Sequence, residues 1–197
     1  MSSQYQQRLH PINLILPLCT SAATLGLSLF QYPLFTSFLN AERLPELKEN
    51  TISITTTTTK ISGTPLSCFW EAFLVPSASL IAGICLASTT SGLLTAYGLR
   101  SAVPVTPQAR AMSMWFSCGA ALALGHLAFV PAVAGPIRAI VNCRAEDEDE
   151  VREDEVREVN EDAMREWLWW HSLRTVAVDG PALVCFAKGV LVGFEGA

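Results

Sequence analysis

The stretch AFLVPSASLIAGICLASTTSGLLTAYGL, residues 72–99, contains no aspartate, glutamate, lysine or arginine. A helix needs about 20 mostly apolar residues to cross the hydrocarbon core of a bilayer, and this stretch of 28 residues exceeds that length. It is also rich in glycine, alanine, serine and threonine, the small residues that let membrane helices approach each other closely. The stretch therefore predicts a transmembrane helix that packs against other helices.

Three further segments are apolar enough to cross a bilayer. Two of them contain no charged side chain over 33 and 27 residues, and the third carries four ionisable side chains within apolar runs. The four expected spans cover about residues 11–35, 72–99, 111–137 and 167–194. The predicted fold is all-α: a four-transmembrane-helix bundle that forms a single integral membrane domain over residues 1–197.

Charged residues are scarce in this chain and unevenly distributed. They make up 16% of the 197 residues, against about 25% in ordinary soluble domains, and the mean hydropathy is +0.34. Because twelve of the 18 acidic residues lie between Glu146 and Glu166, we expect an acidic third loop, the linker 145–166. The polar stretch at residues 40–63 is expected to form the first loop. An ordinary soluble enzyme is excluded. The net charge of −5 and the lack of a basic stripe also exclude a nucleic-acid partner.

The acidic linker is expected to form a solvated, partly helical extension outside the bilayer. Glutamate precedes arginine by four residues three times within it, the last time at Glu161 and Arg165. On a helix, this order and spacing bring opposite charges together and stabilise the helix by about 0.2–0.5 kcal/mol per pair. The sequence thus indicates that the fourth span is preceded by a charged helical segment.

The third predicted span combines a histidine near its middle with a proline-containing end. Pro131, Gly135 and Pro136 interrupt the apolar pattern, so we expect them to kink or end the helix. His126 lies about fifteen residues from either end of the segment, where a buried imidazole needs a hydrogen-bond partner. His126 is therefore a candidate for proton transfer. The alternative is a structural role, in which its hydrogen bonds only hold packed helices together.

The segment WLWWHSLR, residues 167–174, opens the fourth predicted span. With about 100° of rotation per residue, Trp167, His171 and Arg174 share one helix face, whereas Asp179 lies about 140° from Arg174 and is not expected to pair with it on a straight α-helix. Two interpretations stay open. The three side chains line a cavity between helices, or they lie at the membrane interface, where arginine extends to lipid headgroups and tryptophans form an aromatic belt.

No metal or cofactor motif is visible in the sequence. The six cysteines lack the spacing of metal ligands, and there is no glycine-rich nucleotide loop and no nucleophile elbow. The expected metal and cofactor content is therefore none. Cys68 and Cys143 fall in or near the first and third loops, which share one side of the membrane, so they are candidates for a disulfide bond.

Several short motifs resemble the anthrone oxygenase-like family of small fungal membrane proteins. They are FWEAF at residues 69–73, VPAVAGPIRAIVN at residues 130–142 and WLWWHSLR at residues 167–174, in a layout of four spans with a long first loop. The residues that match the pattern of the family are Asn142, Trp167, His171 and Arg174. The resemblance extends over nearly the whole chain in layout.

The resemblance implies oxidation of a polyketide anthrone to an anthraquinone by molecular oxygen, without metal or flavin, in secondary-metabolite biosynthesis. It implies a small aromatic substrate and O2 as partners, within membrane lipid. In this chain it makes His171 the candidate base, Arg174 the cation that stabilises the enolate oxygen, and His126 a second candidate for proton transfer. The candidate substrate-binding residues are Trp167, Trp170 and Asn142.

Two other functions also fit the sequence. A non-catalytic membrane scaffold would use the small-residue face of the second span to bind partner helices. A small transport component would need a continuous polar path, for which the first two spans offer almost no ionisable residues. For a multi-pass chain without a visible sorting signal, the expected location is the endoplasmic reticulum membrane.

Overall fold

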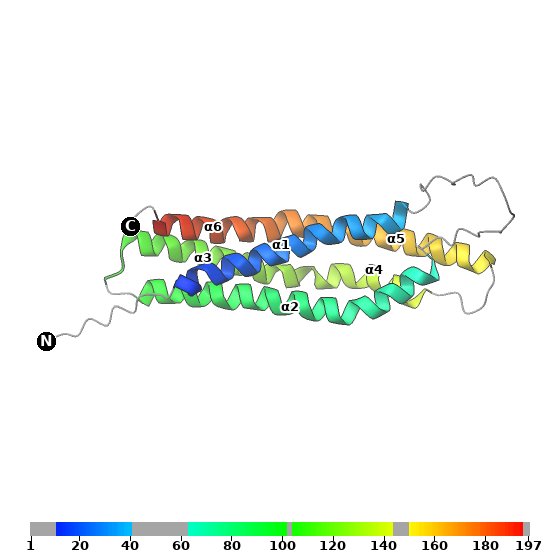
Figure 1. Cartoon of the computed structure of the whole chain (residues 1–197), viewed down its shortest axis with the longest axis horizontal. Coiled ribbons are helices and arrows are strands. Elements are labelled where there is room, and N and C mark those ends of the chain that lie inside the picture. Colours follow the sequence, from blue (N-terminus) through cyan, green and yellow to red (C-terminus); the bar gives the residue numbers. More distant parts are fainter. Residues whose placement is uncertain (1–10, 41–62, 102–103, 144–149, 195–197) are drawn as a thin grey trace, which may run out of the picture.

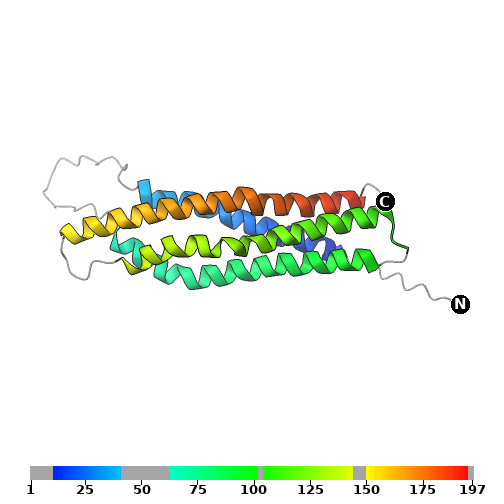
Figure 2. The same ribbon diagram turned by 180° about the vertical axis from the view of Figure 1, so that it is seen from behind.

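The computed structural model describes residues 11–40, 63–101, 104–143 and 150–194, which form four long helical segments lying side by side (Figure 1, Figure 2). The first two segments are single α-helices, and each of the other two contains a short turn of another helical type. In chain order the elements are α1 (Pro11–Asn40), α2 (Thr64–Ser101), α3 (Pro107–Gly125), the 3-10 turn η2 (His126–Phe129), α4 (Val130–Asn142), α5 (Glu150–Arg174), the π-helical turn η3 (Thr175–Asp179) and α6 (Gly180–Phe194).

Each of the four segments is long and apolar enough to cross a membrane. By length and composition, the candidate spans are Ile12–Leu39, Thr64–Ser101, Pro107–Asn142 and Asp154–Phe194. Large apolar side chains cover the outside of the bundle, as at Phe30, which is 67% exposed, and such a surface suits lipid rather than water. The prediction of an all-α bundle of four apolar helices, each a candidate transmembrane span, is confirmed.

Helix α2 begins before the span expected from about residue 72. It starts at Thr64, and its first turns carry Leu66 and Trp70, which are both buried. Asn160 on α5 donates a hydrogen bond through Nδ2 to Ser67 Oγ at 2.9 Å, which ties this end of α2 to the fourth segment. Contacts with other helices therefore set this end of α2, and hydropathy alone cannot show them.

Most of the acidic linker is helical and continuous with the fourth span. Helix α5 begins at Glu150 and extends past the ends of its neighbours (Figure 1). Arg165 Nη2 lies 3.4 Å from Glu161 Oε2, so this expected pair is present. The other two expected pairs include side chains outside the described ones, and residues 41–62 of the polar first loop are outside the described residues.

The third segment changes helical type just before Pro131. Proline has no N–H to donate to the carbonyl four residues earlier, so Leu127 O loses its usual partner. The N–H of Val130 bonds to Leu127 O instead, which tightens the chain into the 3-10 turn. Helix α4 then continues through Pro136. The expected interruption is present, but it lies at His126–Phe129, before the first proline.

Three aromatic rings fill the bundle near the end from which α5 extends. Phe35, Trp70 and Trp167, which we call the aromatic plug, come from α1, α2 and α5 and are all buried. Their ring centroids are 4.9 Å apart for Phe35–Trp70, 4.8 Å for Phe35–Trp167 and 5.2 Å for Trp70–Trp167. Contacts of this kind add about 0.5–1.5 kcal/mol per pair beyond burial. The plug joins three of the four segments.

Toward the other end of the bundle, glycines make room for a phenylalanine. The buried ring of Phe186 on α6 lies against Gly92 on α2 and Gly119 on α3. A Cβ atom added at Gly119 would come within 2.7 Å of Phe186 Cε1, and one at Gly92 within 2.8 Å. The absence of side chains at these two positions thus allows α2, α3 and α6 to pack closely.

Gly119→Ala is expected to lower the free energy of unfolding by about 1–3 kcal/mol, because the added methyl group overpacks a closed core. Gly83→Ala on α2 is the matched control, since a Cβ there meets nothing within 4 Å. Unfolding of the purified protein in detergent micelles, followed by far-UV circular dichroism, measures both. Equal stability of the two variants would contradict this packing arrangement.

Candidate functional site

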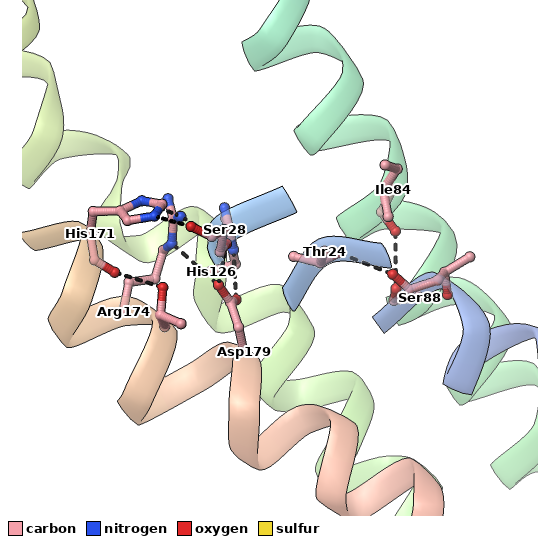
Figure 3. Close-up of polar contacts among 10 residues, drawn as sticks. Thr24, Ser28, Ile84, Ser88, His126, His171, Arg174 and Asp179 are labelled. Carbon is pink, nitrogen blue, oxygen red and sulfur yellow. Dashed lines mark hydrogen bonds and ion pairs between the residues drawn. The ribbon is translucent and has the colours of Figure 1, made fainter. Parts of the chain in front are cut away.

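A cluster of ionisable and polar side chains lies buried in the middle of the bundle. His126 comes from η2, Asp179 from η3, Ser28 from α1, and His171 and Arg174 from α5. Their exposed fractions are 4%, 3%, 4%, 1% and 7%. Figure 3 shows the five side chains pointing toward one another from three different segments. Ionisable groups at this depth are costly, and they persist where they pair with one another or serve a function.

Asp179 is the acceptor at the centre of this cluster. Its Oδ1 lies 2.8 Å from His126 Nδ1, and its Oδ2 accepts a hydrogen bond from Ser28 Oγ at 3.1 Å. Arg174 Nε lies 3.5 Å from Oδ2, close enough for an ion pair. The carboxylate thus has partners from three segments, which offset the free-energy cost of burying its charge.

The contact between Arg174 and Asp179 corrects an expectation drawn from regular α-helix geometry. Five residues along an α-helix correspond to a rotation of about 140°. The chain between them, however, is the π-helical turn η3, in which the N–H of Gly180 bonds to Thr175 O, five residues back. Because a π turn takes about one residue more than an α turn, Asp179 lies roughly one turn beyond Arg174 on the same side. The two side chains therefore meet.

His171 is bonded through both ring nitrogens. Arg174 Nη2 lies 2.8 Å from Nδ1, and Ser28 O lies 2.9 Å from Nε2. A guanidinium can only donate and a carbonyl can only accept, so Nδ1 is the acceptor and Nε2 carries the hydrogen. The ring also stacks on Trp167, with centroids 4.7 Å apart. In this arrangement His171 holds Arg174 in place and has no lone pair left for a ligand.

His126 has the opposite arrangement. Its Nδ1 faces a carboxylate, which only accepts, so Nδ1 carries the hydrogen, and in the neutral ring the lone pair is then on Nε2. Among the described residues, no hydrogen-bond partner of Nε2 is found. A carboxylate that orients a histidine and leaves its second nitrogen open is a recurrent arrangement for a general base.

His126 also lines a cavity between the helices of the bundle. The cavity has a volume of about 270 Å³, close to the lower end of the 300–1,000 Å³ or so that is typical of small-molecule sites. Its lining is mostly apolar and aromatic, with a few polar groups. The lining residues are Gln31, Trp70, Phe73, Leu74, Ser77, Ala78, Ile81, Ala82, His126, Leu127, Val130, Val133, Ala134, Ile137, Arg138, Trp167 and Arg174.

Besides His126 Nε2, further polar groups of the cavity wall lack a hydrogen-bond partner within the part of the chain that the structure describes, among them the Gln31 amide and Trp70 Nε1. Gln31 on α1 is buried, and its amide makes no hydrogen bond there. Trp70 Nε1 is a buried donor without an acceptor. Leaving a fully buried donor such as Trp70 Nε1 unpaired costs about 1–3 kcal/mol. A ligand with oxygen atoms at its edge would give both groups a partner.

The structure brings together only some of the residues singled out from the sequence. His126, Arg174 and Trp167 line the cavity, whereas His171 lies behind Arg174. Trp170 is half-buried and Asn142 is exposed, and neither lines the cavity. Sequence reasoning missed Asp179, Ser28, Gln31 and Trp70 as site residues. The sequence does carry a signal for Ser28 and Gln31, because they belong to a row of polar residues on one face of α1, all of them buried: Ser21, Thr24, Ser28 and Gln31.

The described residues contain no group of three or more histidine, cysteine, aspartate or glutamate side chains placed to hold a metal ion. The candidate disulfide between Cys68 and Cys143 is not present, because neither cysteine takes part in a disulfide bond. The ends of α2 and α4 are connected instead by a hydrogen bond from Ser67 Oγ to Cys143 O at 2.6 Å.

Comparison of the chain with protein-family models, with curated proteins and with solved structures finds no match.

Proposed function

We propose that this protein is a cofactor-independent membrane oxygenase that converts a polyketide anthrone to an anthraquinone with molecular oxygen. The observation that carries the proposal is the cavity, in which aromatic and aliphatic walls meet an oriented base, His126, and a fixed cation, Arg174. An anthrone is a flat, apolar three-ring molecule with one acidic methylene group and one carbonyl oxygen. The apolar walls of the cavity match the rings, His126 the acidic methylene group and Arg174 the carbonyl oxygen.

The first step of the proposed reaction is removal of a proton from the methylene carbon. His126 Nε2 takes the proton, and Asp179 stabilises the imidazolium through Nδ1. The resulting anion is delocalised over the rings and places negative charge on the carbonyl oxygen. Arg174 stabilises this charge, as preorganised donors do at other oxyanion sites. The protein thus supplies a base and charge stabilisation in a water-poor cavity.

The remaining steps need only O2 as oxidant. The anion passes one electron to O2, and the resulting radical pair combines to form a carbon–oxygen bond. The imidazolium of His126 protonates the peroxide. Loss of the second methylene proton then forms the new carbonyl, while the oxygen–oxygen bond breaks and hydroxide leaves as water. Anthrone and O2 give anthraquinone and water, with all electrons accounted for.

The geometry favours a different division of roles between the histidines than the sequence suggested. His171 is the candidate base by position in the motif, but both of its ring nitrogens are engaged. We therefore assign it the positioning of Arg174, and assign the base to His126. The endoplasmic reticulum membrane remains the proposed location, since multi-pass chains are inserted there by default.

The scaffold and transport functions are the competing hypotheses, and a turnover assay separates them from catalysis. Membranes from a host that expresses the chain are supplied with emodin anthrone under air, and emodin formation is followed against membranes without the protein. We expect a rate clearly above the autoxidation background, with one O2 consumed per anthraquinone formed. A rate equal to the background would contradict the oxygenase proposal and favour the scaffold.

A further inference from the structure

The cavity is closed toward the end of the bundle from which α5 extends. The aromatic plug of Phe35, Trp70 and Trp167 lies there, with its rings in mutual contact at centroid distances of 4.8–5.2 Å. All three side chains are buried. Trp70 and Trp167 form the cavity wall at the same time. A molecule that approached along the helix axes from this side would have to displace the plug.

The opposite end of the bundle is closed as well. The buried cluster around Asp179 lies on that side of the cavity, and beyond it Phe186 fills the space against Gly92 and Gly119. Phe116 packs next to Phe186, with ring centroids 6.0 Å apart. Neither end of the bundle therefore offers an open route along the helix axes to the cavity, as far as the described residues show.

The side of the bundle between α2 and α4 is open. The lining residues that are exposed on the outer surface are Ala78 on α2 and Val130 and Arg138 on α4, and Val130 is 53% exposed. Two lining residues on this side, Ala78 on α2 and Ala134 on α4, have small side chains, and a Cβ added at Gly135 would meet nothing within 4 Å. This surface lies within the candidate membrane spans, so in a bilayer it would face lipid.

We propose that the cavity loads and unloads sideways from the bilayer, through a portal between α2 and α4 formed by Ala78, Val130 and Ala134. The occupant is a flat, apolar, polycyclic molecule dissolved in the lipid. Its chemical class rests on the proposed function, but the route itself is inferred from the closed ends and from the exposed lining residues between α2 and α4. An apolar solute reaches such a portal without leaving the hydrocarbon phase, whereas an ion or a sugar would have to cross lipid first.

The test measures binding of 1-aminoanthracene, a fluorescent three-ring aromatic, to the full chain in lipid nanodiscs. Energy transfer from Trp70 and Trp167 reports occupancy, in a background where the tryptophans that do not line the cavity are replaced by phenylalanine: Trp115, Trp169 and Trp170. The variants Ala78→Phe and Ala134→Phe narrow the portal. Ala121→Phe adds the same ring at an exposed position of α3 that does not line the cavity, and is the matched control.

We expect both portal variants to slow association and dissociation together by about tenfold or more, with little change in the dissociation constant. Ala121→Phe should leave both rates at those of the parent chain. Unchanged rates in both portal variants would overturn the proposal, and so would absence of binding in the parent. Faster dissociation with unchanged association would show that the rings merely fill the cavity, which also contradicts a portal. Because no turnover is needed, a chain that binds as expected but oxidises no anthrone would disprove the oxygenase and leave the portal in place.

Discussion

His126→Gln is expected to reduce the protein-dependent rate of emodin formation by about 10²- to 10⁴-fold, the usual contribution of a positioned general base. Glutamine is similar in size and its amide can still donate to Asp179, so the cluster should stay intact. It cannot take a proton from the methylene group. The rate is measured in membranes with equal amounts of protein, after subtraction of the autoxidation background.

Two further variants separate the base from the residues that position it. Asp179→Asn keeps the shape of the side chain but removes the negative charge that stabilises the imidazolium of His126, so it should also lower the rate strongly. His171→Gln should lower the rate less, because glutamine can accept from Arg174 in place of Nδ1 and donate to Ser28 O in place of Nε2. A fully active His126→Gln beside an inactive His171→Gln would reverse the assignment and restore the role that the motif suggested for His171.

The architecture could be predicted from the sequence because a membrane span leaves a strong local signal. A run such as residues 72–99, without a charged side chain, has few alternatives to a helix across the bilayer. The exact start of α2 at Thr64 could not be predicted, since contacts of Leu66 and Trp70 with other helices determine it. The local hydropathy pattern was enough to predict each helix, whereas packing between helices determined the residue at which a helix such as α2 begins.

The site was harder to predict because its central contact depends on an irregular turn. Regular α-helix geometry separates Arg174 from Asp179, and only the π turn η3 brings them together. The pairing of His126 with Asp179 joins residues 53 positions apart, which one sequence does not reveal. By contrast, Trp167 and Arg174 were recognised as members of one helix face, and they do line the same cavity.

Arg174→Met is expected to lower the free energy of unfolding by about 3–5 kcal/mol, because it leaves the carboxylate of Asp179 buried without its arginine. Removing both charges, in Arg174→Met with Asp179→Leu, should recover a large part of that loss, since replacing a buried ion pair by apolar side chains is often close to neutral. Unfolding in detergent micelles on titration with dodecyl sulfate, followed by circular dichroism, measures these differences.

The matched control is Arg165→Met on the same helix. The Arg165 side chain is 60% exposed, against 8% for Arg174, so loss of its ion pairs should cost about 0–1 kcal/mol. If Arg174→Met were as mild as Arg165→Met, the contact with Asp179 would not be an ion pair held away from water. The double variant also distinguishes structure from function: it should fold, yet it should stay inactive, because His126 would no longer have the carboxylate that orients its ring.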